Sequence, residues 1–317
     1  MSPGSRNRNY IVENQRLAAR ESCLRMRALI IQTIRTFFIG RGYLEIETPN
    51  IIPAPAPETH IDAVSAANGF LHPSPELCMK RLLSAGYSAI FQICKCYRGG
   101  ERGRHHLPEF TLLEWYRAGA DYMDIMKECE EMIRAVAADT GRGDRIEYMG
   151  REIDLKGPWQ RMTVHEAFQR YSPMPLEDAL DGDRFDEIMV LHIEPGIDIS
   201  RPLFLYDYPP SLAALSRIKR SDPTLAERFE LYMGGLELAN AFSELTDVDE
   251  QVKRFENERE RRRQLGKADY PFPDRFIKEL GNMPDSAGIA FGIDRLVMLF
   301  ADKETIDDVV SFTPEDI

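Results

Sequence analysis

The sequence predicts an α+β fold in which helices flank an antiparallel β-sheet. Segments that alternate apolar and polar residues, as half-buried strands do, are mixed with segments of helical periodicity. They do not follow the strand–helix–strand rhythm that parallel α/β sheets require. In addition, the strand-like residues 89–98 and 109–117 flank a loop rich in Gly, Arg and His, which is typical of a β-hairpin with a long charged loop.

The N-terminal part of the sequence predicts a long helix followed by a short strand. After Asn14, apolar side chains recur at helical spacing until Gly40 ends the pattern. An alternating strand is predicted at residues 44–47, and it ends before Pro49 because proline lacks the N–H that a sheet requires. The proline-rich residues 53–57 then predict a stiff, extended connector.

The rest of the chain continues the mixed pattern. The predicted elements are an amphipathic helix at 122–136, a helix at 222–232 that runs into a strand at 234–242, a highly charged helix at 249–264, a strand of small residues at 288–292, and a last helix from 294 to 300. The charged helix contains three consecutive arginines, residues 261–263, which are expected on a solvated, salt-bridged face.

Composition limits the classes of function. The chain has 317 residues and a formal charge of −12, so it is not expected to grip long nucleic acid, whose phosphates are bound by basic side chains. Its five cysteines form no CxxC pair and indicate reduced thiols in a cytoplasmic protein. Cys94 and Cys96 are expected on one face of a strand, but two ligands alone do not make a metal site. The sequence also lacks an apolar run of ~18 residues and a signal peptide, so neither a membrane span nor export is expected.

A possible nucleotide site lies at the predicted hairpin. Arg98 opens the charged loop, and strand alternation places Phe110, Leu112, Glu114 and Tyr116 on one face. A guanidinium beside an aromatic ring suits a nucleotide, because the guanidinium binds phosphate and the ring stacks on the base. The residues alone favour a plain surface hairpin. The sequence has no Walker A motif, so phosphate would have to be bound by other means.

Three glutamates, Glu230, Glu237 and Glu244, recur at intervals of seven. In an extended chain Glu237 lies on the opposite face from the other two, unless a bulge near Gly234 and Gly235 shifts the phase. Converging carboxylates near phosphate would bind Mg²⁺, a hard cation that prefers oxygen ligands. The alternative is three surface acids in an acidic chain.

Two further segments contain candidate ligand-binding residues. Ser74-Pro75-Glu76 could present a carboxylate to an amine, although a helix start with an acidic first turn is equally natural. The small residues 288–292 permit the close approach of a ligand or of another strand. Arg295, just after them, could face that ligand or solvent.

In combination, these segments resemble the class II aminoacyl-tRNA synthetases. Residues 43–49 (YLEIETP) resemble the first motif of that family, residues 97–116 the second and residues 288–295 the third, in the same order. Residues 75–77 (PEL) with Lys80-Arg81, and residues 237–244 (ELANAFSE), resemble the lysine subgroup. The resemblance implies the class II catalytic fold, ATP-dependent activation of a lysine-like amino acid, and a homodimer formed through the first motif.

The resemblance also suggests a narrower group. Lysyl-tRNA synthetases carry an N-terminal anticodon-binding OB barrel, for which residues 1–317 leave no room, so a single catalytic domain is expected. This trimmed form is similar to ligases that transfer (R)-β-lysine to a lysine side chain of elongation factor P. Ala290 favours them, because tRNA-charging lysine enzymes have glycine there. The alternatives are a minimal lysyl-tRNA synthetase and a catalytically inactive, synthetase-like amino-acid sensor.

Carried over residue by residue, the resemblance implies that Arg98 and Arg295 are catalytic. The implied ATP-binding residues are Arg98, Gly99, Gly100, Glu101, Leu107, Phe110, Glu237, Leu238, Gly292 and Arg295. The implied substrate-binding residues are Ser74, Pro75, Glu76, Tyr116, Asn240, Glu244 and Ala290, with Glu230 and Glu237 as Mg²⁺ ligands. Within this set, Glu76 would bind the backbone-type amine, Tyr116 and Glu244 the side-chain ammonium, and Asn240 the carboxylate.

Two departures from the family pattern concern ATP. The family has Arg-Asn-Glu at the start of the second motif, whereas this chain has Arg98-Gly99-Gly100-Glu101. Leu107 stands where the family has Asn before Pro-Glu-Phe. The acid that meets the adenine amino group is therefore missing or displaced to Glu101. These changes put ATP affinity and base selectivity in question, and partners are expected to be elongation factor P and a lysine isomer rather than tRNA.

Overall fold

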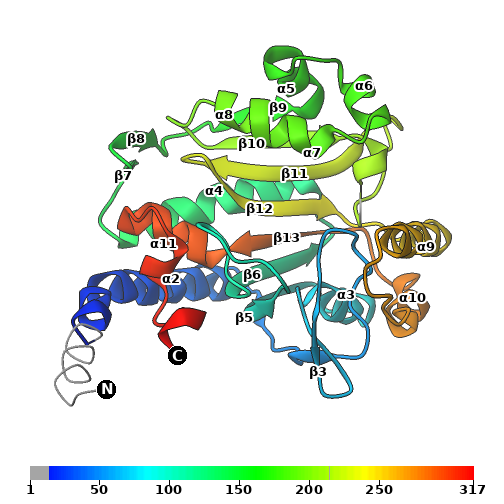
Figure 1. The fold of residues 1–317 in the computed structure, drawn as a ribbon, viewed down its shortest axis with the longest axis horizontal. Coiled ribbons are helices and arrows are strands. Elements are labelled where there is room, and N and C mark those ends of the chain that lie inside the picture. Colours follow the sequence, from blue (N-terminus) through cyan, green and yellow to red (C-terminus); the bar gives the residue numbers. More distant parts are fainter. Residues whose placement is uncertain (1–13, 214) are drawn as a thin grey trace, which may run out of the picture.

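The computed structural model describes residues 14–213 and 215–317 (Figure 1). Its centre is an eight-stranded sheet in the order β1-β5-β6-β13-β12-β11-β10-β9. The six strands from β5 to β10 pair antiparallel, whereas the edge strands β1 and β9 pair parallel to their neighbours. The strands are β1 (Leu44–Glu45), β5 (Ala89–Tyr97), β6 (Glu109–Ala118), β9 (Gln160–Thr163), β10 (Leu203–Tyr208), β11 (Ala226–Met233), β12 (Leu236–Ser243) and β13 (Ser286–Gly292).

Helices and two small sheets surround the central sheet. The helices are α2 (Glu21–Gly40), α3 (Glu76–Ser84), α4 (Tyr122–Asp139), α5 (Val164–Tyr171), α6 (Leu176–Asp181), α7 (Phe185–Ile188), α8 (Glu194–Gly196), α9 (Val248–Gln264), α10 (Asp274–Leu280) and α11 (Ile293–Ala301). The small sheets are β2 (Ile51–Ile52), β4 (Gly69–Leu71) and β3 (Val64–Ala66), in that order, and the hairpin of β7 (Arg145–Tyr148) and β8 (Arg151–Asp154). The α+β prediction is therefore confirmed.

Helices cover one face of the central sheet and form the main core with it, which leaves the opposite face available for a site. Helices α4 and α11 each pack against α2, and between them they contact β6, β12 and β13. This contact forms the main core, in which Trp115 has no exposed surface and packs on Phe38 with ring centroids 4.9 Å apart. Helices α5 to α8 lie at the β9–β10 end of the sheet, whereas α3 packs against β6, α10 against α3, and α9 against α10 (Figure 1). Burial of apolar surface between these layers is the main force that holds them together.

Strand alternation in β6 assigns its side chains to two sides. Trp115 faces the main core, where its indole N–H donates to Glu128 Oε2 at 3.0 Å. The neighbours of Trp115 in sequence, Glu114 and Tyr116, point the other way, as the period of two requires. Glu114 and Tyr116 are nevertheless buried, and helix α3 packs against β6.

The helix predicted at residues 222–232 is wrong. Residues 226–233 form β11, which pairs with β10 on one side and β12 on the other. Leu225, Phe229 and Tyr232 have helical spacing, but the two neighbouring strands supply every ladder bond, and sheet context outweighs local propensity. Gly234 and Gly235, with φ of 61° and 82°, form the two-residue turn to β12, a conformation that favours glycine.

Within the described residues, no helix has both the length and the apolar character needed to cross a membrane.

Candidate active site

A cavity of about 810 Å³ lies on the face of the central sheet opposite α2 and α4. Strands β6, β12 and β13 form its floor, and the loop 98–108, residues 57–61 and helix α9 contribute to its walls. Of the residues predicted from the sequence, the cavity is lined by Ser74, Glu76, Arg98, Glu101, Leu107, Phe110, Tyr116, Glu237, Leu238, Asn240, Ala290, Gly292 and Arg295. A volume of this size accommodates a nucleotide together with an amino acid.

The two predicted guanidinium groups line this same cavity, near the start of β6. The guanidinium carbon of Arg98 lies 5.0 Å from the ring centroid of Phe110. Arg98 Nε is buried and has no hydrogen-bond partner among the described residues. A buried guanidinium N–H without an acceptor is costly, so this group is suited to a ligand oxygen such as that of a phosphate.

Arg295 is held by three hydrogen bonds. Its Nη1 donates to the Glu237 carbonyl at 2.7 Å, its Nη2 donates to His106 Nε2, also at 2.7 Å, and its Nε donates to the His105 carbonyl at 3.4 Å. Burial lowers the pKa of His106 to about 4, with further lowering by Arg295, so the imidazole stays neutral and can accept this hydrogen bond. The loop that carries His106 therefore contacts the arginine at the start of α11.

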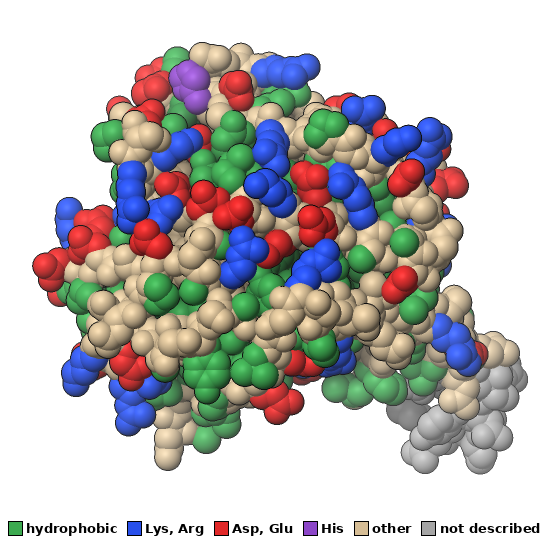
Figure 2. All heavy atoms as spheres, turned by 180° about the vertical axis from the view of Figure 1, so that it is seen from behind, with side chains coloured by type: hydrophobic (Ala, Val, Ile, Leu, Met, Phe, Trp, Pro, Cys, Tyr) green, Lys and Arg blue, Asp and Glu red, His purple; other side chains and the backbone are tan. Residues whose placement is uncertain are grey.

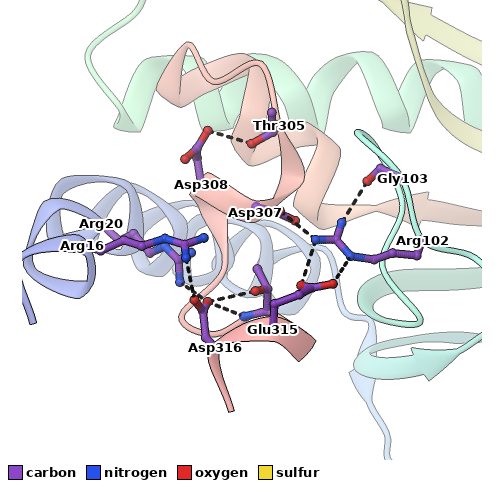
Figure 3. A network of polar contacts seen from close by, with 10 residues as sticks. Arg16, Arg20, Arg102, Gly103, Thr305, Asp307, Asp308, Glu315 and Asp316 are labelled. Atoms are coloured by element: carbon purple, nitrogen blue, oxygen red, sulfur yellow. Dashed lines mark hydrogen bonds and ion pairs between the residues drawn. The ribbon is translucent and has the colours of Figure 1, made fainter. Parts of the chain in front are cut away.

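A second set of contacts ties the same loop to the C-terminal segment (Figure 3). Arg102 binds Asp307 at 2.8 Å and Glu315 at 3.0 Å, and its Nη1 donates to the Gly103 carbonyl. The neighbouring Asp316 is in turn bound by Arg20 of the N-terminal region at 2.8 Å. The loop over the cavity is thus positioned by segments from both ends of the chain.

Glu230 and Glu237 are brought to one side of the β11–β12 hairpin by a bulge. Leu231 pairs with Ala239 and Tyr232 pairs with Glu237, so Leu238 is the extra residue. A bulge was expected near Gly234 and Gly235 if Glu237 was to share a face with Glu230. The bulge exists, but it lies at Leu238, and the two glycines form the turn. The pKa of Glu237 is raised to about 7, first by burial and then by Glu230.

These acids suit a divalent cation. Glu194 joins them from α8, because Tyr232 donates to Glu230 at 2.8 Å and to Glu194 at 3.4 Å. Mutual repulsion of carboxylates is relieved by a cation with oxygen ligands. Glu230 is also bound by Arg228 at 2.6 Å, a contact that a metal ion would compete with.

Glu76 and Glu244, the carboxylates predicted to bind the substrate amines, lie beside a lysine that had no predicted role in the site. Lys80 Nζ is 2.5 Å from Glu76 Oε1 and 2.6 Å from Glu244 Oε2. Neither Lys80 nor Glu244 is exposed, and Glu244 Oε1 has no hydrogen-bond partner within the described part of the chain. Burial raises the pKa of Glu244 to about 7, although Lys80 acts against this. An ammonium group would supply the contact that Glu244 Oε1 lacks.

Glu114, which the sequence placed on the correct face but did not assign to the site, lies at the centre of this region. It accepts hydrogen bonds from Ser74 Oγ at 2.5 Å and from Tyr116 OH at 2.8 Å. The side chain has no exposed surface, and its pKa is raised to about 8 by burial and then by Glu76. The strand alternation places Glu114 on the same face as Phe110 and Tyr116. This pattern could have identified Glu114 as a residue of the site.

Small residues in β13 keep the floor open. Ala290 pairs with Asn240 on one side and Glu114 on the other. A Cβ on Gly288 would lie 2.2 Å from ring carbons of Tyr116 and 2.8 Å from Glu244 Oε1, so only glycine fits there. A Cβ on Gly292, by contrast, would meet its nearest protein atom, Leu238 O, at 3.6 Å, which is ordinary contact.

The predicted residues that do not line the cavity are Pro75, Gly99, Gly100, Glu230 and Glu244, whereas Ser74 and Glu101 line it. Pro75 caps α3, and the Ser74 hydroxyl accepts from the Glu76 N–H at 3.0 Å. Gly99 donates to Asp62 O at 2.6 Å, and Gly100 has a φ of 76°. Glu101 lies 3.9 Å from Arg98.

Two cavity residues were not anticipated. The carboxyl of Glu58 has a pKa raised to about 7 by burial and then by Glu76. Arg228 donates to Asn240 Oδ1 at 3.2 Å, and so holds the amide expected to meet a carboxylate. No spacing along the sequence links either residue to the rest of the site.

The predicted solvated arginine run is wrong for its middle member. Arg263 is exposed and Arg261 is partly exposed, but Arg262 has no exposed surface. Its guanidinium donates to the carbonyls of Glu58, Ile61 and Ala268 at 2.8–3.0 Å and lies over the Tyr270 ring. Arg262 therefore holds the segment that forms one wall of the cavity.

Comparison with known proteins agrees with this arrangement. Residues 4–316 match the family of tRNA synthetases class II (D, K and N). The chain is similar to the elongation factor P–(R)-β-lysine ligase of Vibrio atlanticus, with 38% identity over 306 residues, which cover 91% of this chain and 94% of the relative. The ligases of the same description from Pseudoalteromonas translucida and Yersinia enterocolitica share 36% and 38% identity, over 91% and 90% of this chain and 94% and 93% of theirs.

Proposed function

The chain belongs to the class II tRNA synthetases (D, K and N), and on this premise we propose that it is a ligase that modifies elongation factor P. It uses ATP and Mg²⁺ to activate (R)-β-lysine or lysine as an aminoacyl adenylate. The observation that supports this most directly is the single cavity with guanidinium groups near Phe110 and buried carboxylates near Tyr116. These residues are six apart on β6, or about 20 Å at ~3.4 Å per residue, which suits an extended adenylate.

In the first step, a carboxylate oxygen of the substrate attacks the α-phosphorus of ATP, and the bond to the β-phosphate oxygen breaks to release pyrophosphate. No protein nucleophile is required, because positioning and charge neutralisation suffice. Arg98 binds the α-phosphate, Phe110 stacks on adenine, and Arg295 covers the other face of the base and reaches the γ-phosphate. In the second step, a lysine amine of elongation factor P attacks the activated carbonyl, and AMP leaves.

Charge complementarity supports a diamino acid as the substrate. Glu76, Glu114 and Glu244 together carry up to three negative charges, and Lys80 returns one positive charge. The two remaining negative charges match the two ammonium groups of lysine or β-lysine. A monoamine would leave a buried carboxylate unpaired, and this disfavours other amino acids.

Glu230 and Glu237 would hold Mg²⁺ beside the phosphates, and Glu230 is linked to Glu194 through the hydroxyl of Tyr232. The bound ion would neutralise phosphate charge as pyrophosphate leaves. Glu237→Gln should weaken the Mg²⁺ dependence of pyrophosphate exchange without changing the binding of lysine, which can be measured in the absence of ATP.

Intact-mass analysis of elongation factor P tests the proposed function. Incubation with this protein, ATP and (R)-β-lysine should add one lysyl residue to the acceptor, whereas a parallel reaction with tRNA should give no aminoacylated product. Charging of tRNA in place of elongation factor P would favour the minimal lysyl-tRNA synthetase. Absence of ATP–pyrophosphate exchange with every lysine isomer would favour the amino-acid sensor.

Arg98→Ala tests the catalytic assignment. Losing a charge-assisted contact that forms in the transition state costs about 2–3 kcal/mol, which corresponds to a 30- to 150-fold lower rate of exchange. Arg104→Ala is a matched control, because Arg104 belongs to the same loop and pairs with Glu304 at the surface. Equal rates for the two variants would contradict the role of Arg98.

A homodimer would bury apolar side chains that the single chain exposes. Ile39, Leu44 and Ile51, at the end of α2 and in the two short strands that follow it, are at least half exposed. Hydrophobic side chains are visible in the lower half of the back face, below a region in which both charges are interspersed (Figure 2). Sedimentation of the wild type and of Leu44→Glu should give a dimer and a monomer, respectively. A cytoplasmic location is part of this proposal, because the five cysteines, which form no disulfide, would stay reduced there.

A further inference from the structure

One cluster of metal-ligating side chains lies outside the proposed reaction. A ring nitrogen of His72 and the Sγ atoms of Cys94 and Cys96 all lie within 4.8 Å of one another. His72 follows β4, whereas the cysteines occupy alternate positions of β5, so the fold adds a third ligand from a separate segment. Two cysteines on one strand face would not form a metal site, but a Cys₂His set supplies three of the four ligands of a zinc site.

The imidazole of His72 is oriented as a metal ligand would be. His72 Nε2 lies 3.2 Å from Asn50 Oδ1, so Nε2 carries the proton and Nδ1 keeps a free lone pair. The ring has no exposed surface, and Nδ1 has no hydrogen-bond partner of normal geometry in residues 14–213 or 215–317, although the ring also interacts with the Ser74 backbone. A buried nitrogen acceptor without a donor is unfavourable unless a ligand occupies it. A ligating histidine commonly donates its other N–H to a fixed acceptor, as His72 does.

The backbone fixes the same residue on both sides. The His72 N–H donates to Asn50 O at 2.9 Å, and the Tyr97 N–H donates to His72 O at 3.1 Å. His72 is therefore bound directly to the strand that carries the two cysteines. Such a preorganised set loses little conformational freedom when it takes up a metal ion.

The distances suit a tetrahedral ion. Zn–S bonds of about 2.3 Å at tetrahedral angles place two sulfurs about 3.8 Å apart, and the Sγ atoms of Cys94 and Cys96 are 3.8 Å apart. With a Zn–N bond of about 2.0–2.1 Å, the nitrogen should lie about 3.6 Å from each sulfur, which a small rotation of the imidazole can achieve. Cys94 is partly exposed, so water can supply the fourth ligand.

We propose that His72, Cys94 and Cys96 bind one Zn²⁺ or similar soft divalent ion through Nδ1 and two thiolates. The site is separate from the Mg²⁺ ligands, which offer only carboxylate oxygens. It adjoins the nucleotide region, because Cys96 pairs with Phe110 and Cys94 with Leu112 across β5 and β6. It does not depend on the proposed ligase function, and each can fail without the other.

Titration of the purified, reduced chain with Co²⁺ tests the site. One equivalent should produce thiolate-to-cobalt charge-transfer absorption and the visible bands of tetrahedral cobalt, and Zn²⁺ should abolish both. His72→Ala, Cys94→Ser and Cys96→Ser should each weaken binding by at least about 10- to 100-fold, the loss that even a second-shell change causes. Cys78→Ser is the matched control, because Cys78 is a half-buried thiol outside the cluster.

Two further variants distinguish coordination from a general disturbance. Asn50→Ala, which removes only the acceptor of the Nε2 proton, should weaken cobalt binding about 10-fold and leave the bands in place. Glu237→Gln should have no effect on them. Cobalt spectra that lack thiolate bands, or binding that survives Cys94→Ser and Cys96→Ser, would overturn the assignment. Thermal unfolding of metal-free Cys94→Ser, the variant of the partly exposed ligand, should match the wild type, which shows that the loss of binding comes from the ligand.

Discussion

Glu114→Gln is expected to have opposite effects on two properties. It should weaken the binding of the substrate and raise the stability of the protein without substrate. The Glu114 side chain has no exposed surface, and its pKa is about 8 in the folded chain against an ordinary value of 4.5. At ~1.36 kcal/mol per pKa unit, this difference amounts to a folding penalty on the order of 5 kcal/mol once the group is ionised in both states. Because glutamine does not ionise, the variant lacks this penalty.

The sign of the pH dependence follows from the raised pKa. A carboxyl whose folded-state pKa exceeds its unfolded-state value imposes no penalty below about pH 4.5, and stability is lost as the pH rises through about 8. The wild type should therefore lose stability more steeply than Glu114→Gln between pH 6 and pH 8.5. At pH 8.5 the empty variant should be the more stable protein. Buried carboxyls that do not interact with Glu114 are present in both proteins, so their contributions cancel.

Substrate binding should show the opposite trend. An ammonium group needs Glu114 as a carboxylate, so binding expels a proton, and this residue alone should raise the affinity by up to about tenfold per pH unit below pH 8. Losing a charge-assisted hydrogen bond costs roughly 1.5–3 kcal/mol. The variant should therefore bind lysine and (R)-β-lysine about 10- to 150-fold more weakly and lose this part of the pH dependence.

Isothermal titration in two buffers of different ionisation enthalpy measures both the affinity and the protons released. Denaturant unfolding from pH 6 to pH 8.5 measures the stability. Glu109→Gln is the control, because Glu109 lies exposed on the same strand and pairs with Lys95 at the surface. Coincident stability profiles for the wild type and Glu114→Gln, or an unchanged affinity for lysine, would refute the argument that Glu114 is a strained acid held for the substrate.

Three other predictions concern residues whose contacts are described above. Gly288→Ala should abolish lysine binding and destabilise the fold by about 1–3 kcal/mol through overpacking. Gly292→Ala should unfold like the wild type and raise the KM for ATP. Equal effects of the two variants on lysine and on ATP would contradict this assignment of the two glycines to different substrates. Arg262→Ala should lower the free energy of unfolding by about 3–5 kcal/mol, because it leaves buried carbonyls without donors, whereas the exposed Arg263→Ala should change it by less than about 1 kcal/mol. Arg102→Ala should free the loop from the C-terminal segment and raise the KM for ATP more than the KM for lysine; an unchanged KM for ATP would show that this anchor is dispensable.

The sequence alone determined the features that depend on local periodicity and on motifs. Strand alternation placed Phe110 and Tyr116 on one face of β6, and helical periodicity located α2 and α4. These patterns survive folding because a strand has a period of two and a helix of 3.6 in any context. The order of three motif-like segments indicated the class II synthetase family, to which the chain belongs.

Only the tertiary structure decided the features that depend on neighbours distant in the sequence. The helix-like residues 222–232 became part of β11 because strands on both sides supplied its ladder. The bulge at Leu238 follows from the pairing with β11 and brings Glu237 to the side of Glu230. Burial, which no local pattern reveals, separated Arg262 from its exposed neighbours and placed Lys80 between two acids. Such contacts arise from packing. Wherever the layers of the fold bury a charged or hydrogen-bonding group, that group needs a partner, and the partner can come from any part of the chain.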